Sequence, residues 1–136
     1  MGVGDGDVHA LDLLSGHELW RFHAGGKIWF RPAVDAQRVY FGSGDGHVYA
    51  LDQQTGVEQW RFRTGASAEG SVELADGVLY AGSHDFHLYA LDQASGRALW
   101  RMRTGGSVFN PRVVGGRLYV ASADQYLYAL NLPSRP

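Results

Sequence analysis

One ten-residue motif occurs three times in the chain at a spacing of 40 residues. It reads L-D-L-L-S-G-H-E-L-W from Leu11, L-D-Q-Q-T-G-V-E-Q-W from Leu51 and L-D-Q-A-S-G-R-A-L-W from Leu91. An incomplete fourth copy begins at Leu130, which is 39 residues after Leu91. Repeats of this period are typical of stacked units such as propeller blades. We therefore expect a series of similar small sheets.

The motif itself predicts a tight hairpin turn followed by a strand. In the second copy, Asp52 and Thr55 can bond neighbouring backbone groups, and Gly56 supplies the positive φ that a tight return needs. The strand that follows alternates apolar and basic residues as W-R-F-R. Because side chains on a strand alternate between its two faces, Trp60 and Phe62 should share one face.

The pattern A-L-D-x-x-[ST]-G-x-x-x-W, which begins at Ala10, Ala50 and Ala90, resembles the tryptophan-docking repeat of quinoprotein-type (PQQ-like) β-propellers. The resemblance implies an all-β fold in which each blade has four antiparallel strands. The family includes dehydrogenases that use pyrroloquinoline quinone, an outer-membrane assembly lipoprotein without a cofactor, and sensor portions of bacterial kinases. The resemblance therefore predicts the fold but leaves several functions open.

The repeat divides the chain into about 3.4 units of 40 residues. We expect a partial blade at 3–26, complete blades at 27–66 and 67–106, and a partial blade at 107–136. In the first complete blade, the expected strands are Ile28–Val34, Arg38–Gly42, His47–Leu51 and Glu58–Arg63. No stretch shows helical periodicity.

Closing this chain on itself would give a ring of three blades, whereas propellers have about four to eight. Open blade faces and strand edges favour pairing with another chain. We therefore expect the ring to be completed by a homo-oligomer, two copies giving about six to eight blades, or by further blades of a longer polypeptide. A protein partner that binds the assembled propeller is also expected.

Composition and charge exclude several classes of function. The net charge of −2 offers no attraction for nucleic acid. The absence of cysteine excludes a disulfide scaffold, a Cys-ligated zinc and thiol catalysis. No apolar run approaches the ~20 residues of a membrane-spanning helix, so direct membrane insertion is not expected. The start of the sequence has no signal-peptide pattern; if the chain is a fragment, the resemblance implies a periplasmic or other extracytoplasmic location.

The candidate binding residues lie where the repeats differ, because shared blade geometry does not dictate their identity. Aligned on the Gly pair before each first strand, the copies read K-I-W-F-R-P from Lys27, S-A-E-G-S-V from Ser67 and S-V-F-N-P from Ser107. In a propeller the first strand of each blade borders the central channel. The predicted binding residues are Trp29, Phe30, Arg31, Glu69, Phe109 and Asn110. Aromatic faces beside an arginine would suit a planar ligand that bears carboxylates. The alternative is that each residue serves local packing or a solvated channel wall.

No catalytic or metal site is predicted. His84 and His87 form the only close histidine pair, which is weak evidence for a metal. The resemblance implies that a quinoprotein dehydrogenase would carry an adjacent-cysteine disulfide over its cofactor and a calcium site near a catalytic Asp; the chain has no Cys and no matching cluster. We therefore expect a protein that is not an enzyme and has no cofactor.

Three functional hypotheses follow. The first is a non-catalytic scaffold that presents loops or a central channel for protein or ligand binding. The second is a module that binds or senses pyrroloquinoline quinone as part of a larger quinoprotein or kinase. The third is a truncated or engineered propeller fragment that assembles with copies of itself.

Overall fold

The fold consists of strands and turns only. The computed structural model describes residues 6–68 and 70–132, and within them it contains thirteen strands and no helix, hence none that could cross a membrane. The strands are β1 (Asp7–Leu11), β2 (Glu18–His23), β3 (Ala33–Val34), β4 (Arg38–Gly42), β5 (His47–Asp52), β6 (Glu58–Arg63), β7 (Val72–Ala75), β8 (Val78–Gly82), β9 (His87–Asp92), β10 (Ala98–Arg103), β11 (Val108–Val114), β12 (Arg117–Ser122) and β13 (Leu127–Asn131).

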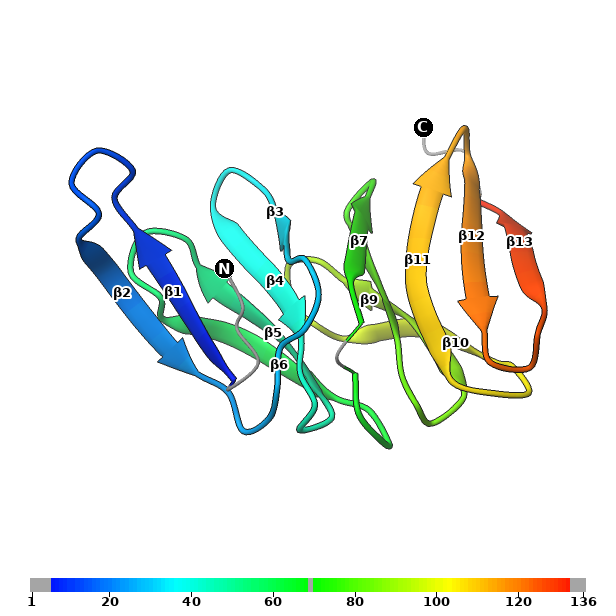
Figure 1. The fold of residues 1–136 in the computed structure, drawn as a ribbon. Coiled ribbons are helices and arrows are strands. Elements are labelled where there is room, and N and C mark those ends of the chain that lie inside the picture. The colour runs from blue at the N-terminus through cyan, green and yellow to red at the C-terminus, as the bar shows by residue number, and fades with distance from the viewer. Residues whose placement is uncertain (1–5, 69, 133–136) are drawn as a thin grey trace.

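These strands form four antiparallel sheets that follow one another along the chain (Figure 1). Their orders are β1-β2, β3-β4-β5-β6, β7-β8-β9-β10 and β11-β12-β13. The β1-β2 hairpin and β13 lie at opposite ends of the row, so the described part of the chain forms an open arc and not a closed ring (Figure 1). The all-β propeller architecture expected from the repeat is confirmed.

One expected strand is much shorter than predicted. The sequence pattern predicted a strand over Ile28–Val34, but β3 contains only Ala33 and Val34. Pro32 precedes β3, and proline has no N–H to donate to the strand β4. Proline alone does not end the pairing, because Pro111 at the equivalent repeat step lies within β11 (Val108–Val114); residues 28–32 run as irregular chain before the sheet begins.

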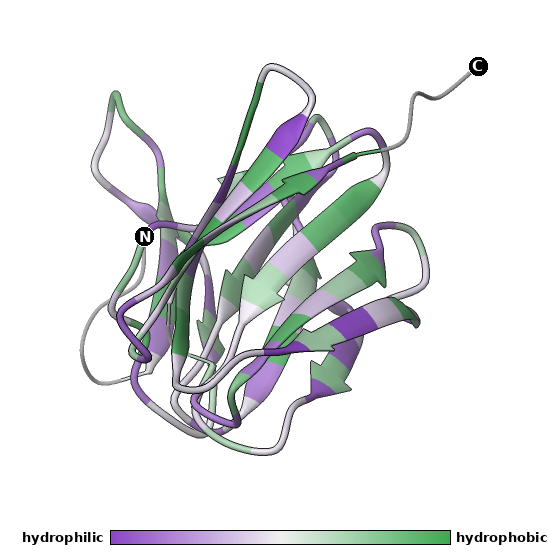
Figure 2. Ribbon diagram, turned by 90° about the vertical axis from the view of Figure 1, so that its right-hand side faces the viewer, coloured by the Kyte–Doolittle hydropathy of each residue, from purple (hydrophilic) through white to green (hydrophobic). Residues whose placement is uncertain are grey.

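The hydrophobic core lies between the sheets. Each of three buried clusters combines side chains from two neighbouring sheets, as in the cluster that contains Tyr40 and Trp60 from one sheet and Leu79 and Leu91 from the next. The middle strands of the four-stranded sheets, such as β4 and β8, are buried on both faces, whereas the outer strand β6 alternates between exposed and covered positions. The hydrophobic residues of these sheets (Figure 2) therefore need a neighbouring sheet on each side.

The tryptophans of the repeat pack on the hairpin turn of the following sheet. Trp60 is 8% exposed, and its indole N–H donates to the carbonyl oxygen of Gln93 at 3.0 Å. A Cβ atom at Gly96 would lie 2.4 Å from the ring of Trp60, so only glycine leaves room for the indole. Trp20 makes the equivalent contact with the turn at Gly56 and donates to the carbonyl oxygen of Gln53 at 2.8 Å.

A second repeated contact joins each of the last three sheets to the loop that precedes it. The Asp85 carboxylate accepts hydrogen bonds from the hydroxyl of Tyr89 and, at 2.8 Å, from the N–H of Gly65. The same arrangement recurs at Asp45 with Tyr49 and Gly25, and at Asp124 with Tyr128 and Gly105.

These hydrogen bonds set the protonation of both partners. Burial raises the pKa of Asp85, but the hydrogen bonds from Tyr89, Gly65 and His87 outweigh it, and the pKa lies below its usual value. Burial, together with the bond to Asp85, raises the pKa of Tyr89 to about 12. The folded state therefore favours the pair in which Asp85 is ionised and Tyr89 is protonated.

We predict that Trp60→Ala lowers the free energy of unfolding by about 3 to 5 kcal/mol, because it removes a buried indole and leaves a cavity between two sheets. The matched control is Trp29→Ala, since Trp29 is 56% exposed and its removal should cost about 1 kcal/mol or less. Urea unfolding followed by circular dichroism measures both variants. Equal losses in the two variants would contradict the placement of Trp60.

We further predict that stability falls at both ends of the pH range. The lowered pKa of Asp85 gives stability that is present above about pH 4 and is lost as the pH falls through the folded-state value. The raised pKa of Tyr89 gives stability that is present below about pH 10 and is lost as the pH rises toward about 12.

Tyr89→Phe tests this assignment, because it removes the phenol and one hydrogen bond to Asp85. The variant should lose about 1 to 2 kcal/mol at pH 7 and show a smaller decline in both the acid and the alkaline range. Tyr119→Phe is the control, since no hydrogen bond joins Tyr119 to these aspartates in the described structure. Urea midpoints measured across the pH range decide; identical profiles for Tyr89→Phe and the wild type would rule the assignment out.

Candidate binding pocket at the inner strands

The first strands of three successive sheets lie side by side. Strand β7 contacts both β3 and β11, and the three form the inner edge of the arc (Figure 1). The register is the same in the three sheets, because Ala33 pairs with Tyr40, Glu73 with Tyr80 and Arg112 with Tyr119.

A pocket of about 440 Å³ lies at this edge. We call it the inner-strand pocket; it is lined by Arg31, Pro32, Ala33, Ser71, Val72, Glu73, Asn110, Pro111, Arg112 and Val113. Each of the three sheets contributes lining residues from its first strand or from the segment just before it. The pocket therefore depends on the packing of sheets against one another and not on any one blade.

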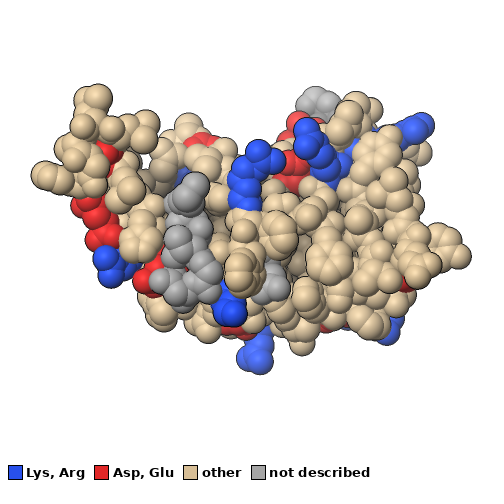
Figure 3. Space-filling view, in the orientation of Figure 1, with Lys and Arg blue, Asp and Glu red and all other residues tan. Residues whose placement is uncertain are grey.

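Charge in the pocket comes from two arginines and one glutamate, each from a different sheet. Arg31 and Arg112 contribute guanidinium groups, and one carboxylate oxygen of Glu73 accepts the N–H of Val113 at 2.7 Å. Figure 3 shows basic side chains on both sides of acidic ones along the upper rim of this face. Two arginines against one glutamate leave the lining of the pocket with an excess of positive charge.

Asn110 joins β11 to the neighbouring sheet. Its side-chain oxygen accepts hydrogen bonds from both the backbone N–H and the hydroxyl of Ser71, each at 3.0 Å. Its backbone φ is +48°, a conformation that asparagine adopts more readily than most residues. The pairing of β11 with β12 is irregular between Phe109 and Arg112, which lets this part of the strand turn toward the pocket.

The structure brings together only part of the predicted set of binding residues. Arg31 and Asn110 line the pocket. Trp29 and Phe30 are exposed and lie outside it; the ammonium of Lys27 is 5.3 Å from the Trp29 ring centroid. Phe109 contacts the ring of His84 edge-on at 5.5 Å between centroids. Glu69 lies outside the described residues.

Sequence reasoning missed Ser71, Glu73 and Arg112. The repeat itself carried the signal. The same repeat position is occupied by Arg31, Ser71 and Asn110, which are separated by 40 and 39 residues. Ala33, Glu73 and Arg112 occupy another. At both repeat positions, each copy has a different residue.

The chemistry available in the pocket is recognition of an anion. Two guanidinium groups from different sheets can each hold a carboxylate through paired N–H donors. In the described part of the chain, no group of three or more His, Asp or Glu side chains is placed to hold a metal ion.

Comparison with known proteins agrees with this architecture. The family model described as outer membrane protein assembly factor BamB matches residues 4–134. No curated protein matches the sequence.

Three solved structures resemble the fold. The computationally designed Ika4 protein has a TM-score of 0.86 and 16% identity over 97% of this chain and 83% of its own. The designed Ika8 protein has a TM-score of 0.85 and 17% identity over 96% of this chain and 42% of its own. BamB from Moraxella catarrhalis has a TM-score of 0.58 and 22% identity over 93% of this chain and 56% of its own.

This chain thus spans less than two thirds of the length of Ika8 and of BamB. At these identities the structural likeness shows the fold alone. The match over residues 4–134 shows the family, and the chain belongs to the BamB-like family of PQQ-like β-propeller proteins.

Proposed function

We propose that this chain is a non-catalytic β-propeller scaffold that binds an acidic segment of a partner protein in the inner-strand pocket. The observation that carries the proposal is the convergence of Arg31, Glu73 and Arg112 from three successive sheets on one pocket of about 440 Å³. This volume lies within the range of small-ligand sites and accommodates a few side chains.

The two arginines give the pocket a preference for carboxylates. A guanidinium holds a carboxylate through two parallel N–H donors, and charge-assisted bonds of this kind are stronger than neutral ones. Glu73 stands between the two cations in the sequence of sheets, and one of its oxygens is held by the Val113 N–H. A bound acidic segment would therefore place its carboxylates at Arg31 and Arg112 and avoid Glu73.

Binding of pyrroloquinoline quinone is the competing proposal, and the same arginines could serve its carboxylates. A planar quinone would also be stabilised by an aromatic face. The residues that line the pocket include no aromatic ring, because Trp29 and Phe30 lie outside it. This arrangement favours a flexible acidic peptide over a planar cofactor.

Catalysis is not part of the proposal. Glu73 is the only carboxylate among the lining residues, and its hydrogen bond to the backbone holds it as a structural acceptor. General acid–base chemistry requires a group that can exchange a proton with the substrate. Turnover of an alcohol or sugar with an artificial electron acceptor would overturn this part of the proposal.

We predict that hexaglutamate binds to the wild type and that the double variant Arg31→Ala/Arg112→Ala binds it at least about tenfold more weakly. Arg97→Ala is the matched control, since Arg97 lies in the β9–β10 turn and not in the pocket. Isothermal titration at low and at physiological salt measures all three proteins. The binding should weaken as salt increases.

The same titration with pyrroloquinoline quinone separates the two proposals. Arginine-dependent binding of hexaglutamate without binding of the quinone supports the scaffold. Quinone binding that is tighter than peptide binding and is lost in the double variant would replace the scaffold by a cofactor-binding module. Peptide binding that is the same in the double variant and the wild type would remove the inner-strand pocket from the proposal.

A further inference from the structure

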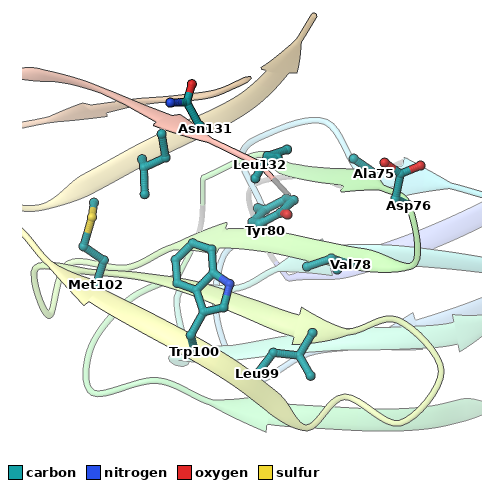
Figure 4. A pocket seen from close by; sticks show the side chains of 10 residues that line it. Ala75, Asp76, Val78, Tyr80, Leu99, Trp100, Met102, Asn131 and Leu132 are labelled. Carbon is teal, nitrogen blue, oxygen red and sulfur yellow. The ribbon is translucent and has the colours of Figure 1, made fainter. Parts of the chain in front are cut away.

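A cavity of about 390 Å³ lies at the β11–β13 end of the arc, between β10 and β13 (Figure 4). Its lining is mainly apolar and comprises Ala75, Asp76, Val78, Tyr80, Leu99, Trp100, Met102, Leu130, Asn131 and Leu132. Trp100 points into this space and remains 38% exposed.

Trp100 is the repeat equivalent of Trp60, but no turn among the described residues packs on it. Trp60 is covered by the turn at Gly96, which also accepts its indole N–H at the carbonyl of Gln93. That turn connects the third and fourth strands of its sheet. The last sheet has only β11, β12 and β13 among the described residues, so no such turn faces Trp100.

The opposite end of the arc has a turn without a tryptophan. The β1–β2 turn has the same backbone hydrogen bonds as its counterparts: the N–H of Gly16 donates to the carbonyl of Asp12 at 2.7 Å, and that of Gly56 donates to the carbonyl of Asp52 at 2.9 Å. Gly16 has a φ of +72°, and no atom lies within 4 Å of a Cβ built there. The turn is therefore already formed, and the space above its glycine is open.

The strand beside this turn is also uncovered. Leu11 is 55% exposed, whereas its repeat equivalents Leu51 and Leu91 are completely buried against the preceding sheet. Among the strands that the structure describes, β1 pairs with β2 alone. This end of the arc thus offers a strand edge, an apolar side chain and a glycine turn, all of which the other end can use.

We propose that the β1–β2 hairpin of a second copy of this chain replaces β13 beside β12 and completes a four-stranded blade. Trp100 of one copy then packs on Gly16 of the other and donates its indole N–H to the carbonyl of Leu13, as Trp60 does to that of Gln93 within one chain. Leu11 of the second copy lies opposite Leu118, in the place that Leu130 occupies now. The register follows that of Leu79 with Leu91.

A second copy fits this role better than the same chain does. The two ends of one arc are on opposite sides of the molecule (Figure 1), and joining them would give a ring of about three blades. Two chains that exchange hairpins give about six blades, within the range of about four to eight that propellers adopt. Displacement of β13 removes the packing of Tyr128 and Leu130 on the cluster between the last two sheets, and β1 of the incoming hairpin brings His9 and Leu11 to the same repeat positions.

The test uses the full chain and three variants. Gly16→Asn keeps the positive φ, which asparagine tolerates, but its side chain occupies the space that the indole needs. Trp100→Ala removes the indole. Gly115→Asn is the matched control, because Gly115 is also a turn glycine with positive φ and open surroundings, but lies between β11 and β12.

Molar mass measured by light scattering after size exclusion, over a range of concentrations, should show a two-chain species for the wild type and for Gly115→Asn. Gly16→Asn and Trp100→Ala should each have the mass of one chain, with circular dichroism showing that both remain folded. A wild type with the mass of one chain at every concentration, or a Gly16→Asn variant that pairs as the wild type does, would overturn the proposal.

Mixing the two defective variants tests the pairing of ends directly. Gly16→Asn retains an intact Trp100, and Trp100→Ala retains an intact Gly16, so one of the two junctions can form between them. We expect a 1:1 complex in the mixture that neither variant forms alone. Failure of the mixture to associate, while the wild type does, would show that the two-chain species has another interface and would overturn the exchange of hairpins.

Discussion

The packing of an indole on a glycine turn is the contact on which the rest of this structure depends. Each sheet has an apolar face and no core of its own, so the buried clusters lie between sheets. Trp60 closes one such cluster because Gly96 leaves room for the ring and the carbonyl of Gln93 accepts its N–H. The hydrogen bonds between Asp85, Tyr89 and Gly65 then join the same two sheets at the other end of the strands. The junction between blades thus both buries apolar side chains and provides hydrogen bonds for polar groups.

Because neighbouring sheets cover one another, the sheets at the two ends of the arc each lack a neighbour on one side. The contact groups left at these two ends are complementary. In the described part of the chain, no turn packs on the indole of Trp100 and no indole packs on the turn at Gly16. In repeat architectures, stability is approximately the sum of the repeats and the interfaces between them. In the proposed assembly, one additional junction would repeat between chains the contact that joins blades within a chain. Because the proposed contact between chains is the one already used within the chain, self-association would require no new kind of interface.

The junctions also create the candidate binding site. The inner-strand pocket is formed by three first strands, and each contributes side chains that the blade geometry does not specify. Arg31, Ser71 and Asn110 occupy one repeat step, and Ala33, Glu73 and Arg112 occupy another. The constant residues of the repeat hold the sheets together, while the residues at the variable repeat positions line the candidate binding site. A scaffold of this kind can change its ligand without changing its packing.

The sequence by itself determined the repeat, the all-β class, the hairpin turns and the strands of each blade, because turn residues and two-residue alternation are local properties. Of the residues it predicted, Arg31 and Asn110 line the inner-strand pocket, whereas Trp29 and Phe30 lie outside it, and the expected inner strand is shorter than predicted. The tertiary structure alone decided which variable residues meet. Ser71, Glu73 and Arg112 come together with Arg31 only when three sheets pack at a particular angle and offset, and the identity of each contact depends on that packing. For the same reason, only the tertiary structure showed that Trp60 is covered and Trp100 is not.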